Sequence, residues 1–228
     1  PYFHIPLVMQ DDVEKALFIG GGGFTIPQKF AEENITVHAV EIDPGVIEAA
    51  EKNFNLTESE NLKVYNSDGR QFLQESNHTY DVIYIDAYRK SKVPFHLTTE
   101  EFMELTYQKT DEDGIVMSNV ISAASGSGSK FARSQFKTME QVYESVYYFP
   151  TQPRSQVQNV EILASKESLK TTDELLERNA NHSGMDLSSE IRNLGEPPET
   201  GDVPILRDDY APVNRLIEPL VGREYTLE

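Results

Sequence analysis

The sequence predicts an α/β fold built on a doubly wound, mostly parallel sheet of seven strands that ends in an antiparallel hairpin. Three observations lead to this expectation. Strand-like and helix-like segments alternate from Lys15 to about Val120, which is typical of a parallel sheet covered by helices. Four glycines, Gly20 to Gly23, follow the first strand at once. A short, proline-containing segment separates the last two strands, which favours a hairpin over a crossover.

The expected strands are short runs of mostly apolar, β-branched or aromatic residues. They are residues 15–19, 36–40, 62–65, 80–86, 114–120, 145–149 and 159–165. Residues 80–86 are apolar on both faces, so we expect this strand to lie at the centre of the sheet. His38 lies inside a strand pattern and is expected in the core or at the surface rather than as a metal ligand.

The expected helices carry start signals. Residues 25–33 form the first, and Pro27 is tolerated because it falls in the first turn. Pro44 opens the second, which has these apolar residues on one face: Val46, Ile47, Ala50 and Phe54. Other helices are expected through Phe72 and Leu73, after an N-cap at Thr98 or Thr99 with Glu100 or Glu101 in the first turn, and at residues 131–143 after a Ser/Gly loop at 121–130.

We expect three segments along the chain. Residues 1–165 form a nucleoside-binding catalytic domain, and residues 166–205 form a charged helix to about Asn181 followed by a Gly/Pro-rich loop. Residues 206–228 are expected to pack back on the same domain. Because the chain begins at Pro1 rather than Met, we expect it to be an excerpt, so an upstream targeting or membrane segment stays open.

The composition narrows the classes of partner. The chain has 38 acidic and 20 basic residues and a net charge of −18, a field that repels nucleic acids and attracts cations such as polyamines. Solubility alone is the other explanation of this charge. The absence of Cys excludes disulfides and thiol nucleophiles, and the five histidines show no metal-ligand spacing. We therefore expect no nucleic-acid partner and no metal.

The glycine run and an acidic residue predict a nucleoside site. Gly20, Gly21, Gly22 and Gly23 let the backbone approach a ligand, and the next helix offers its positive end to a carboxylate. Glu41 ends the second strand about 20 residues on, where an acid can accept hydrogen bonds from ribose hydroxyls. Asp43 is a second candidate, although Asp-Pro also suits a helix N-cap. The pattern favours an S-adenosylmethionine-type cofactor. A flexible turn is one alternative, and a dinucleotide cofactor is another, although residues 20–25 lack a clean G-x-G-x-x-G placement.

Two more carboxylates end strands. Asp68, followed by Gly69, ends the third strand, where it can accept the exocyclic amine of adenine or simply form a turn. Asp86 ends the fourth strand at the carboxyl edge of the sheet, where ligands bind in this architecture. Beside a sulfonium, Asp86 can orient or deprotonate an attacking amine. A loop-capping role for Asp86 is the alternative.

Several of these segments resemble the spermidine/spermine synthase family: residues 16–20, 40–44, 67–70 and 80–86. Residues 93–102 and 208–213 further resemble the spermidine synthase-like domains found fused behind membrane-spanning segments. The resemblance implies a class I S-adenosylmethionine-dependent methyltransferase-like Rossmann fold. It also implies transfer of an aminopropyl group from decarboxylated S-adenosylmethionine to a polyamine, with a cytoplasmic location.

The resemblance implies roles for individual residues. Glu41 would hold the ribose, Asp68 the adenine, and Asp86 would be the catalytic carboxylate. The acceptor site would draw on these residues of the chain: Tyr88, Asp208, Asp209 and Tyr210. Family members often dimerise through an N-terminal β-hairpin domain, for which Pro1 to Asp12 is too short, so a homodimer stays open.

The sequence departs from the family at two places. Residues 20–24 lack the loop Asp that helps to bind the amine, and residues 87–93 lack a second Asp after the catalytic one. Arg89, Lys90 and Lys92 stand there instead. If they face the site they disfavour a polyamine, because a dication needs carboxylates around it; if they face solvent they have no bearing on it. Asp208 and Asp209 would restore negative charge if the tail folds over the site.

Three functions therefore stay open at the level of sequence. The first is an aminopropyltransferase-like enzyme that acts on a polyamine. The second is an S-adenosylmethionine-dependent methyltransferase on the same fold. An Asp in the glycine loop would repel the carboxylate of the intact cofactor, so the absence of that Asp favours this function. The third is a non-catalytic domain that senses a nucleoside or polyamine.

Overall fold

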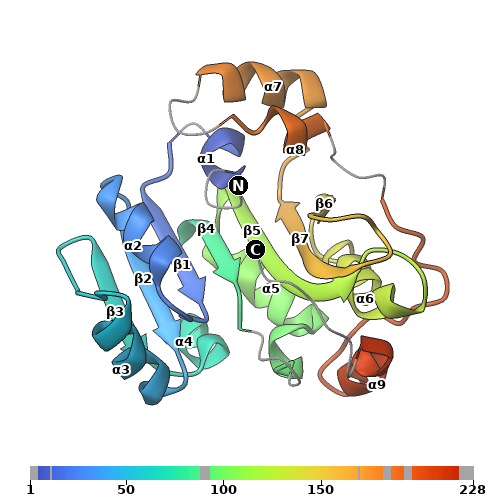
Figure 1. Ribbon diagram of the computed structural model, residues 1–228, viewed down its shortest axis with the longest axis horizontal. Helices are drawn as coiled ribbons and strands as arrows, with labels where there is room; N and C mark the ends of the chain where they lie inside the picture. The colour runs from blue at the N-terminus through green and yellow to red at the C-terminus, as the bar shows by residue number, and fades with distance from the viewer. Residues whose placement is uncertain are drawn as a thin grey trace.

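A computed structural model describes residues 5–10, 12–87, 93–168, 170–181, 186–192 and 197–220. Within these ranges, helices cover both faces of a seven-stranded sheet of order β3-β2-β1-β4-β5-β7-β6 (Figure 1). The strands are β1 (Lys15–Ile19), β2 (Thr36–Glu41), β3 (Leu62–Asn66), β4 (Tyr80–Ile85), β5 (Thr110–Ala123), β6 (Ser145–Pro150) and β7 (Val157–Ser165).

The sheet is parallel from β3 to β5 and antiparallel at its other end. β1 pairs in parallel with β2 and β4, β2 with β3, and β4 with β5. β7 runs antiparallel to both β5 and β6. The predicted doubly wound sheet with a terminal hairpin is therefore confirmed. β4 lies in the middle, as its apolar character on both faces predicts.

The helices follow their start signals. They are α1 (Ile5–Met9), α2 (Thr25–Glu32), α3 (Pro44–Asn53), α4 (Gly69–Glu75), α5 (Glu100–Lys109), α6 (Lys130–Met139), α7 (Thr172–Asn181), α8 (Ser188–Arg192) and α9 (Val213–Ile217), with 3₁₀ turns η1 (Phe95–Leu97), η2 (Ser127–Ser129) and η3 (Glu218–Leu220). Asp43 caps α3 by accepting a hydrogen bond from Gly45 N, and Thr99 caps α5 by accepting one from Phe102 N. No helix within the described ranges is both long enough and apolar enough to span a bilayer.

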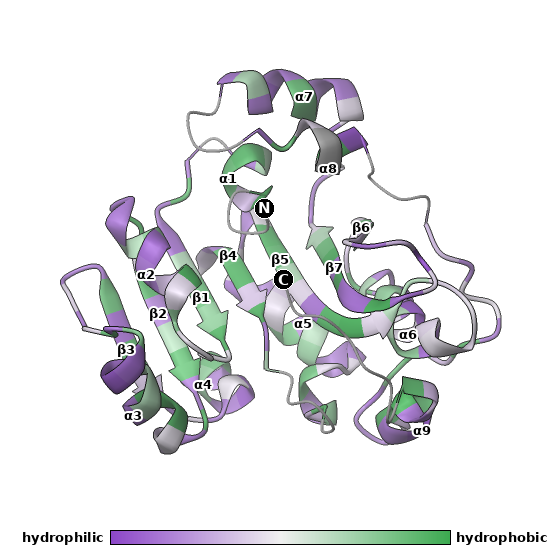
Figure 2. Ribbon diagram, viewed as in Figure 1, coloured by the Kyte–Doolittle hydropathy of each residue, from purple (hydrophilic) through white to green (hydrophobic). Residues whose placement is uncertain are grey.

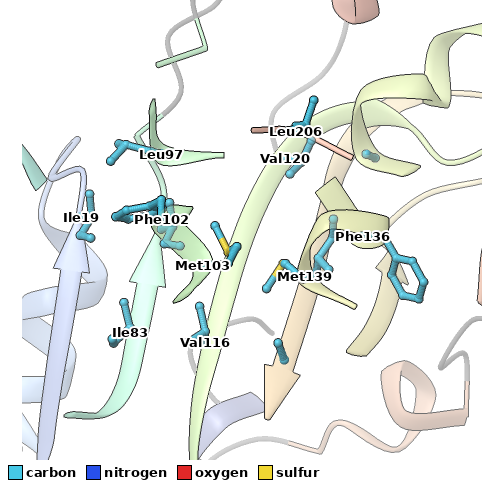
Figure 3. Packing of buried hydrophobic residues seen from close by; sticks show 14 of the residues in the cluster. Ile19, Ile83, Leu97, Phe102, Met103, Val116, Val120, Phe136, Met139 and Leu206 are labelled. Atoms are coloured by element: carbon cyan, nitrogen blue, oxygen red, sulfur yellow. The ribbon is translucent and has the colours of Figure 1, made fainter. Parts of the chain in front are cut away.

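Two hydrophobic cores sandwich the sheet. On one face, side chains of α4, α5, α6 and α9 pack against the strands, and Figure 3 shows Phe102, Met103, Phe136 and Met139 meeting there. On the other face, the strands pack against α1, α2, α3, α7 and α8. Figure 2 shows hydrophobic residues along β1, β4 and β5, whereas α7 alternates between hydrophilic and hydrophobic residues, as a helix with one buried face does.

His38 belongs to the core. It is buried on β2, and its Nδ1 lies 2.9 Å from the Tyr80 hydroxyl oxygen. The rings of Tyr65, Phe72 and His78 surround it edge-on. Burial, followed by the neighbouring His78, lowers the pKa of His38 to about 4. The ring is therefore neutral at physiological pH and acts as a packed aromatic group.

Several predicted boundaries are wrong. α3 ends at Asn53, so Phe54 leaves the helical face and is 55% exposed, and Ala50 is the only fully buried member of that face. β5 is twice as long as expected, because it begins at Thr110, which pairs with Tyr80 of β4, and its pairing with β7 continues to Ala123 through what was predicted as loop. α6 correspondingly begins at Lys130 and ends at Met139. The charged helix begins only at Thr172.

The C-terminal segment returns to the main body of the chain. Leu206 is fully buried, its N–H donates to Thr138 Oγ1 at 2.9 Å, and its carbonyl accepts from Glu100 N at 2.8 Å. Figure 3 shows Leu206 beside Val120 in the hydrophobic core. These contacts agree with the predicted return of the tail, while the division into three segments stays a prediction.

Candidate functional site

The strand ends of β1, β2 and β4 meet at one edge of the sheet, which lies at the bottom of Figure 1. Gly20 N donates to Val40 O at 2.8 Å, and Asp86 N donates to Ile19 O at 2.8 Å. Because parallel strands end at the same edge, the glycine loop, Glu41 and Asp86 are neighbours there. The sequence-predicted cofactor residues are thus brought together.

Close packing, against backbone at one position and against an aromatic ring at the other, explains two of the four loop glycines. Gly20 has φ +99°, and a Cβ there would lie 2.2 Å from the carbonyl oxygen of Asp86. A Cβ on Gly21 would lie 2.1 Å from the buried ring of Phe24. Gly22 has φ +50° but open space around it, and a Cβ on Gly23 would meet only the edge of Phe54 at 3.3 Å. The loop is therefore a packed turn over the end of β4.

Glu41 connects the end of β2 to the glycine loop. Its side chain is buried; Oε2 accepts from Gly21 N at 3.0 Å and Oε1 accepts from Asp43 N at 2.9 Å. Each oxygen keeps a further lone pair, which is what a ribose hydroxyl needs. Asp43 instead uses its carboxylate as the cap of α3 at 2.9 Å. The geometry favours Glu41 over Asp43 as the ligand-binding acid.

Asp68 caps α4 and contacts a histidine that the sequence did not reveal. Oδ1 accepts from Arg70 N and Gln71 N at 3.0 Å each, and Oδ2 lies 2.8 Å from His96 Nε2. Burial raises the pKa of Asp68, but the bonds from Gln71, His96 and Arg70 outweigh it, so this pKa lies below its usual value. Gly69 serves packing, since a Cβ there would lie 2.2 Å from Ile19 Cγ2.

Asp86 follows β4 directly and has the environment of a tuned acid. Its side chain reaches solvent, yet the protein around it removes part of its hydration, and Oδ1 accepts from Asn119 Nδ2 at 2.9 Å. Loss of hydration raises the pKa of Asp86 to about 6, with the Asn119 bond opposing the shift. A carboxylate with such a pKa exchanges protons near neutral pH.

Asn119 and Glu161 are polar side chains that follow Asp86 across the neighbouring strands. Neither was predicted from the sequence as a site residue. Asn119 on β5 pairs in register with Glu161 on β7, on the face that packs against α1 and α2. Glu161 has 0% exposure, and burial followed by the nearby Asp86 raises its pKa well above the usual value. The Tyr84 hydroxyl donates to Glu161 Oε1 over a long 3.5 Å.

The predicted acceptor residues are not all available to a ligand. Tyr88 lies outside the described residues, together with the basic residues at 89, 90 and 92. Asp208 forms a bidentate pair with Arg70, at 2.7 Å for both bonds, and also accepts from Thr99 Oγ1 at 2.7 Å. Its charge is therefore already neutralised by the protein. Asp209 is exposed, and so is Tyr210, at 56%.

A series of hydrogen bonds links the C-terminal segment to Asp68, the candidate adenine contact. Arg70 Nη1 donates to Asp208 and, at 3.1 Å, to the carbonyl of His96, whose ring contacts Asp68. The structure therefore assigns Asp208 to holding the tail against α4 and η1. The supply of negative charge to an acceptor site, which the sequence suggested for Asp208, is not supported by these contacts.

Comparison with known protein families identifies the family to which this chain belongs. Residues 2–173 match the spermine/spermidine synthase domain model. The chain belongs to this family. A polyamine aminopropyltransferase from Vibrio vulnificus is 32% identical over 148 residues, which cover 63% of this chain and 48% of that protein. One from Thermococcus kodakarensis is 27% identical over 161 residues, which cover 64% and 54%. The chain thus spans about half the length of these relatives.

Solved structures share the fold. A spermidine synthase from Thermotoga maritima has a TM-score of 0.67 at 20% identity, over 86% of this chain and 71% of that one. Human methyltransferase-like protein 13, in complex with SAH, has a TM-score of 0.64 at 20% identity, over 86% and 90%. The predicted methyltransferase-like fold and the predicted family are confirmed. Membership of the membrane-fused subgroup stays a prediction.

The glycine loop can be tested with a matched pair of variants. Gly22→Ala is expected to lower the free energy of unfolding by about 1–2 kcal/mol, because φ is positive but space is free. Gly20→Ala adds a clash with the Asp86 backbone to similar strain, so it should cost clearly more in urea denaturation. Equal losses for the two variants would contradict the packed-turn interpretation.

Asp86 predicts a pH dependence of stability. Its pKa is raised on folding, so between about pH 4 and 6 the folded state binds more protons than the unfolded state, and stability falls as pH rises. Asp86→Asn removes this contribution. The variant should therefore gain stability relative to wild type above pH 6, with the difference vanishing below about pH 4, as thermal unfolding at a series of pH values will show. A constant difference would exclude the shifted pKa.

Proposed function

We propose that this chain is a polyamine aminopropyltransferase whose carboxyl edge binds decarboxylated S-adenosylmethionine and an amine acceptor. One observation carries the proposal: in a chain of this family, the carboxylate that ends β4 is partly dehydrated and hydrogen-bonded to Asn119. The relatives of which this chain covers about half the length are named polyamine aminopropyltransferases. Their names support the same activity here. Family membership favours this function over methyl transfer.

The nucleoside would lie between the glycine loop and the ends of β2 and β3. Glu41 would accept from the ribose hydroxyls, since its carboxylate is fixed by Gly21 N and Asp43 N. Asp68 would accept from the adenine amine, in competition with His96. Ile42, which follows Glu41, is 61% exposed and offers an apolar surface to the base.

The reaction would join the amine to the aminopropyl group. The sulfonium donor supplies an electrophilic carbon, to which the uncharged amine nitrogen forms a bond while the carbon–sulfur bond breaks and its electron pair stays on sulfur as methylthioadenosine. The new ammonium then loses a proton. Asp86, ionised above its pKa of about 6, would orient the attacking amine and accept this proton. Asn119 would hold the carboxylate in place through its Nδ2.

The net charge of −18 supports a cationic acceptor, because a negative field raises the local concentration of cations. Which amine is used is part of this proposal, and so are a homodimer, a cytoplasmic location and fusion to an upstream membrane region. The non-catalytic alternative predicts binding of a nucleoside or amine without product.

Product formation tests the proposal. We expect methylthioadenosine when the protein is incubated with decarboxylated S-adenosylmethionine and a panel of diamines, followed by chromatography. Asp86→Asn should lower kcat by about 10²–10⁴-fold, the usual contribution of a positioned acid or base. Asp113→Asn makes the same chemical change at an exposed position near the opposite end of β5 and should leave kcat unchanged.

Two results would reject the proposal. One is a protein that binds the nucleoside but forms no methylthioadenosine with any amine. The other is an Asp86→Asn variant with the activity of Asp113→Asn, since the catalytic assignment then fails.

A further inference from the structure

Three neighbouring strands carry a row of polar groups toward one point. Asp86 follows β4, Asn119 lies on β5 and Glu161 lies on β7, and Asn119 pairs directly with Glu161. Ile85 pairs with Ser118, so the next residues, Asp86 and Asn119, lie side by side and form the 2.9 Å bond already described. The row thus extends from the solvent-accessible Asp86 into the protein.

Two acceptors of this row lack a donor among the described residues. They are Asn119 Oδ1 and Glu161 Oε2, on side chains that are 9% and 0% exposed. An acceptor without a partner costs free energy when it is removed from water, so such atoms in a folded protein call for an explanation. The two atoms belong to residues that face each other across one strand pair, so a single donor group placed between them would satisfy both.

We propose that Glu161 is a second carboxyl of the acceptor site and that, with Asn119 and Asp86, it binds the ammonium groups of a polyamine. This inference rests on the proposed function and deepens it by naming a dication as the preferred acceptor. An ammonium offers three N–H donors and no acceptor, which matches a row that presents only acceptor atoms once Glu161 has released its proton. The second carboxyl thus comes from β7, in a family member whose glycine loop lacks an Asp.

The charges of the row fit this role. Burial first, and then the charge of Asp86, raises the pKa of Glu161, whereas Asp86 ionises near pH 6. Of the described groups that face Glu161, Asp86 and Tyr84 are titratable, and Asn119 and Phe149 from β5 and β6 carry no charge. Burial and the charge of Asp86 therefore both favour the protonated form of Glu161 in the free protein. A bound dication stabilises the second negative charge, so Glu161 releases its proton to solvent.

A purely structural role makes a different prediction. A protonated Glu161 that only packs against Tyr84 has no reason to respond to an amine. The 3.5 Å separation between the Tyr84 hydroxyl and Glu161 Oε1 is also at the limit of a hydrogen bond, so this contact alone does not account for a carboxyl at a site where an apolar residue would suffice.

Proton release on binding separates the two roles. Putrescine and propylamine are titrated into the full chain by calorimetry at pH 7.5, in two buffers with different ionisation enthalpies. For wild type we expect release of close to one proton per putrescine, and much less with propylamine. Glu161→Gln keeps the shape of the side chain but should abolish this release and weaken putrescine binding by about tenfold or more, with propylamine changed less than about threefold.

Glu140→Gln is the matched control, because Glu140 is an exposed residue at the end of α6. It should behave as wild type in both titrations. In the enzymatic assay, Glu161→Gln should raise KM for the diamine by a similar factor while kcat changes little, since Asp86 is intact. The proton count in wild type needs no variant, so the test holds even if Glu161→Gln folds poorly.

Each outcome of these experiments supports or overturns the inference, the proposed function or both. If methylthioadenosine forms but Glu161→Gln keeps the proton release and the preference for putrescine, the inference is wrong and the proposed function stands. If putrescine binds with release that depends on Glu161 but no amine gives product, the dication site stands and the transferase function fails. If wild type binds neither amine nor forms product, both are overturned.

Discussion

The contact between the glycine loop and the chain that follows β4 is the constraint on which the candidate site depends. Gly20 lies against the carbonyl of Asp86 so closely that no side chain fits between them, and hydrogen bonds to Val40 and Ile19 fix both segments to the ends of β1 and β2. The parallel sheet supplies the alignment. The absence of a side chain at Gly20 lets a ligand-binding turn and a reactive carboxylate share one place.

Four carboxyl groups near this edge differ in environment, and the differences sort their roles. Glu41 is held by two backbone N–H groups. Asp68 accepts from two backbone N–H groups and contacts His96, and these bonds lower its pKa and favour its ionised form. Asp86 and Glu161 lose hydration instead, which raises their pKa values. Separation of acids by environment is how one site holds a fixed anion and a proton acceptor together. The proposed roles follow the same division: Glu41 and Asp68 contact the cofactor, and Asp86 and Glu161 contact the acceptor.

Local signals in the sequence predicted most of the fold. The apolar run at 80–86, the glycines after β1 and the cap at Asp43 each act within a few residues. The alternation of strands and helices indicates the parallel part of the sheet. The partners of the site are harder to predict because they lie far apart in the chain. Asn119 meets Asp86 from 33 residues away, His96 meets Asp68 from 28, and Glu161 sits in a strand pattern that marks it only as part of β7.

The same limit applies to the expectation for the tail. The acids at 208 and 209 suggested charge for an amine, but the sequence cannot show that Arg70, 138 residues away, already pairs with Asp208. Phe54 is a local example, since one residue beyond the end of α3 is enough to turn an apolar side chain toward solvent. Tertiary pairing decides the role of Asp208, and the end of a helix decides that of Phe54; residue type alone decides neither.

Binding of the donor tests the central claim most directly. Calorimetric titration with decarboxylated and intact S-adenosylmethionine compares two ligands that differ by one carboxylate. With Asp86 ionised at the edge and no cation paired to it among the described residues, the added carboxylate meets repulsion. The account predicts at least about tenfold tighter binding of the decarboxylated form, which is about 1.4 kcal/mol. Tighter binding of the intact form would contradict the account and point to methyl transfer.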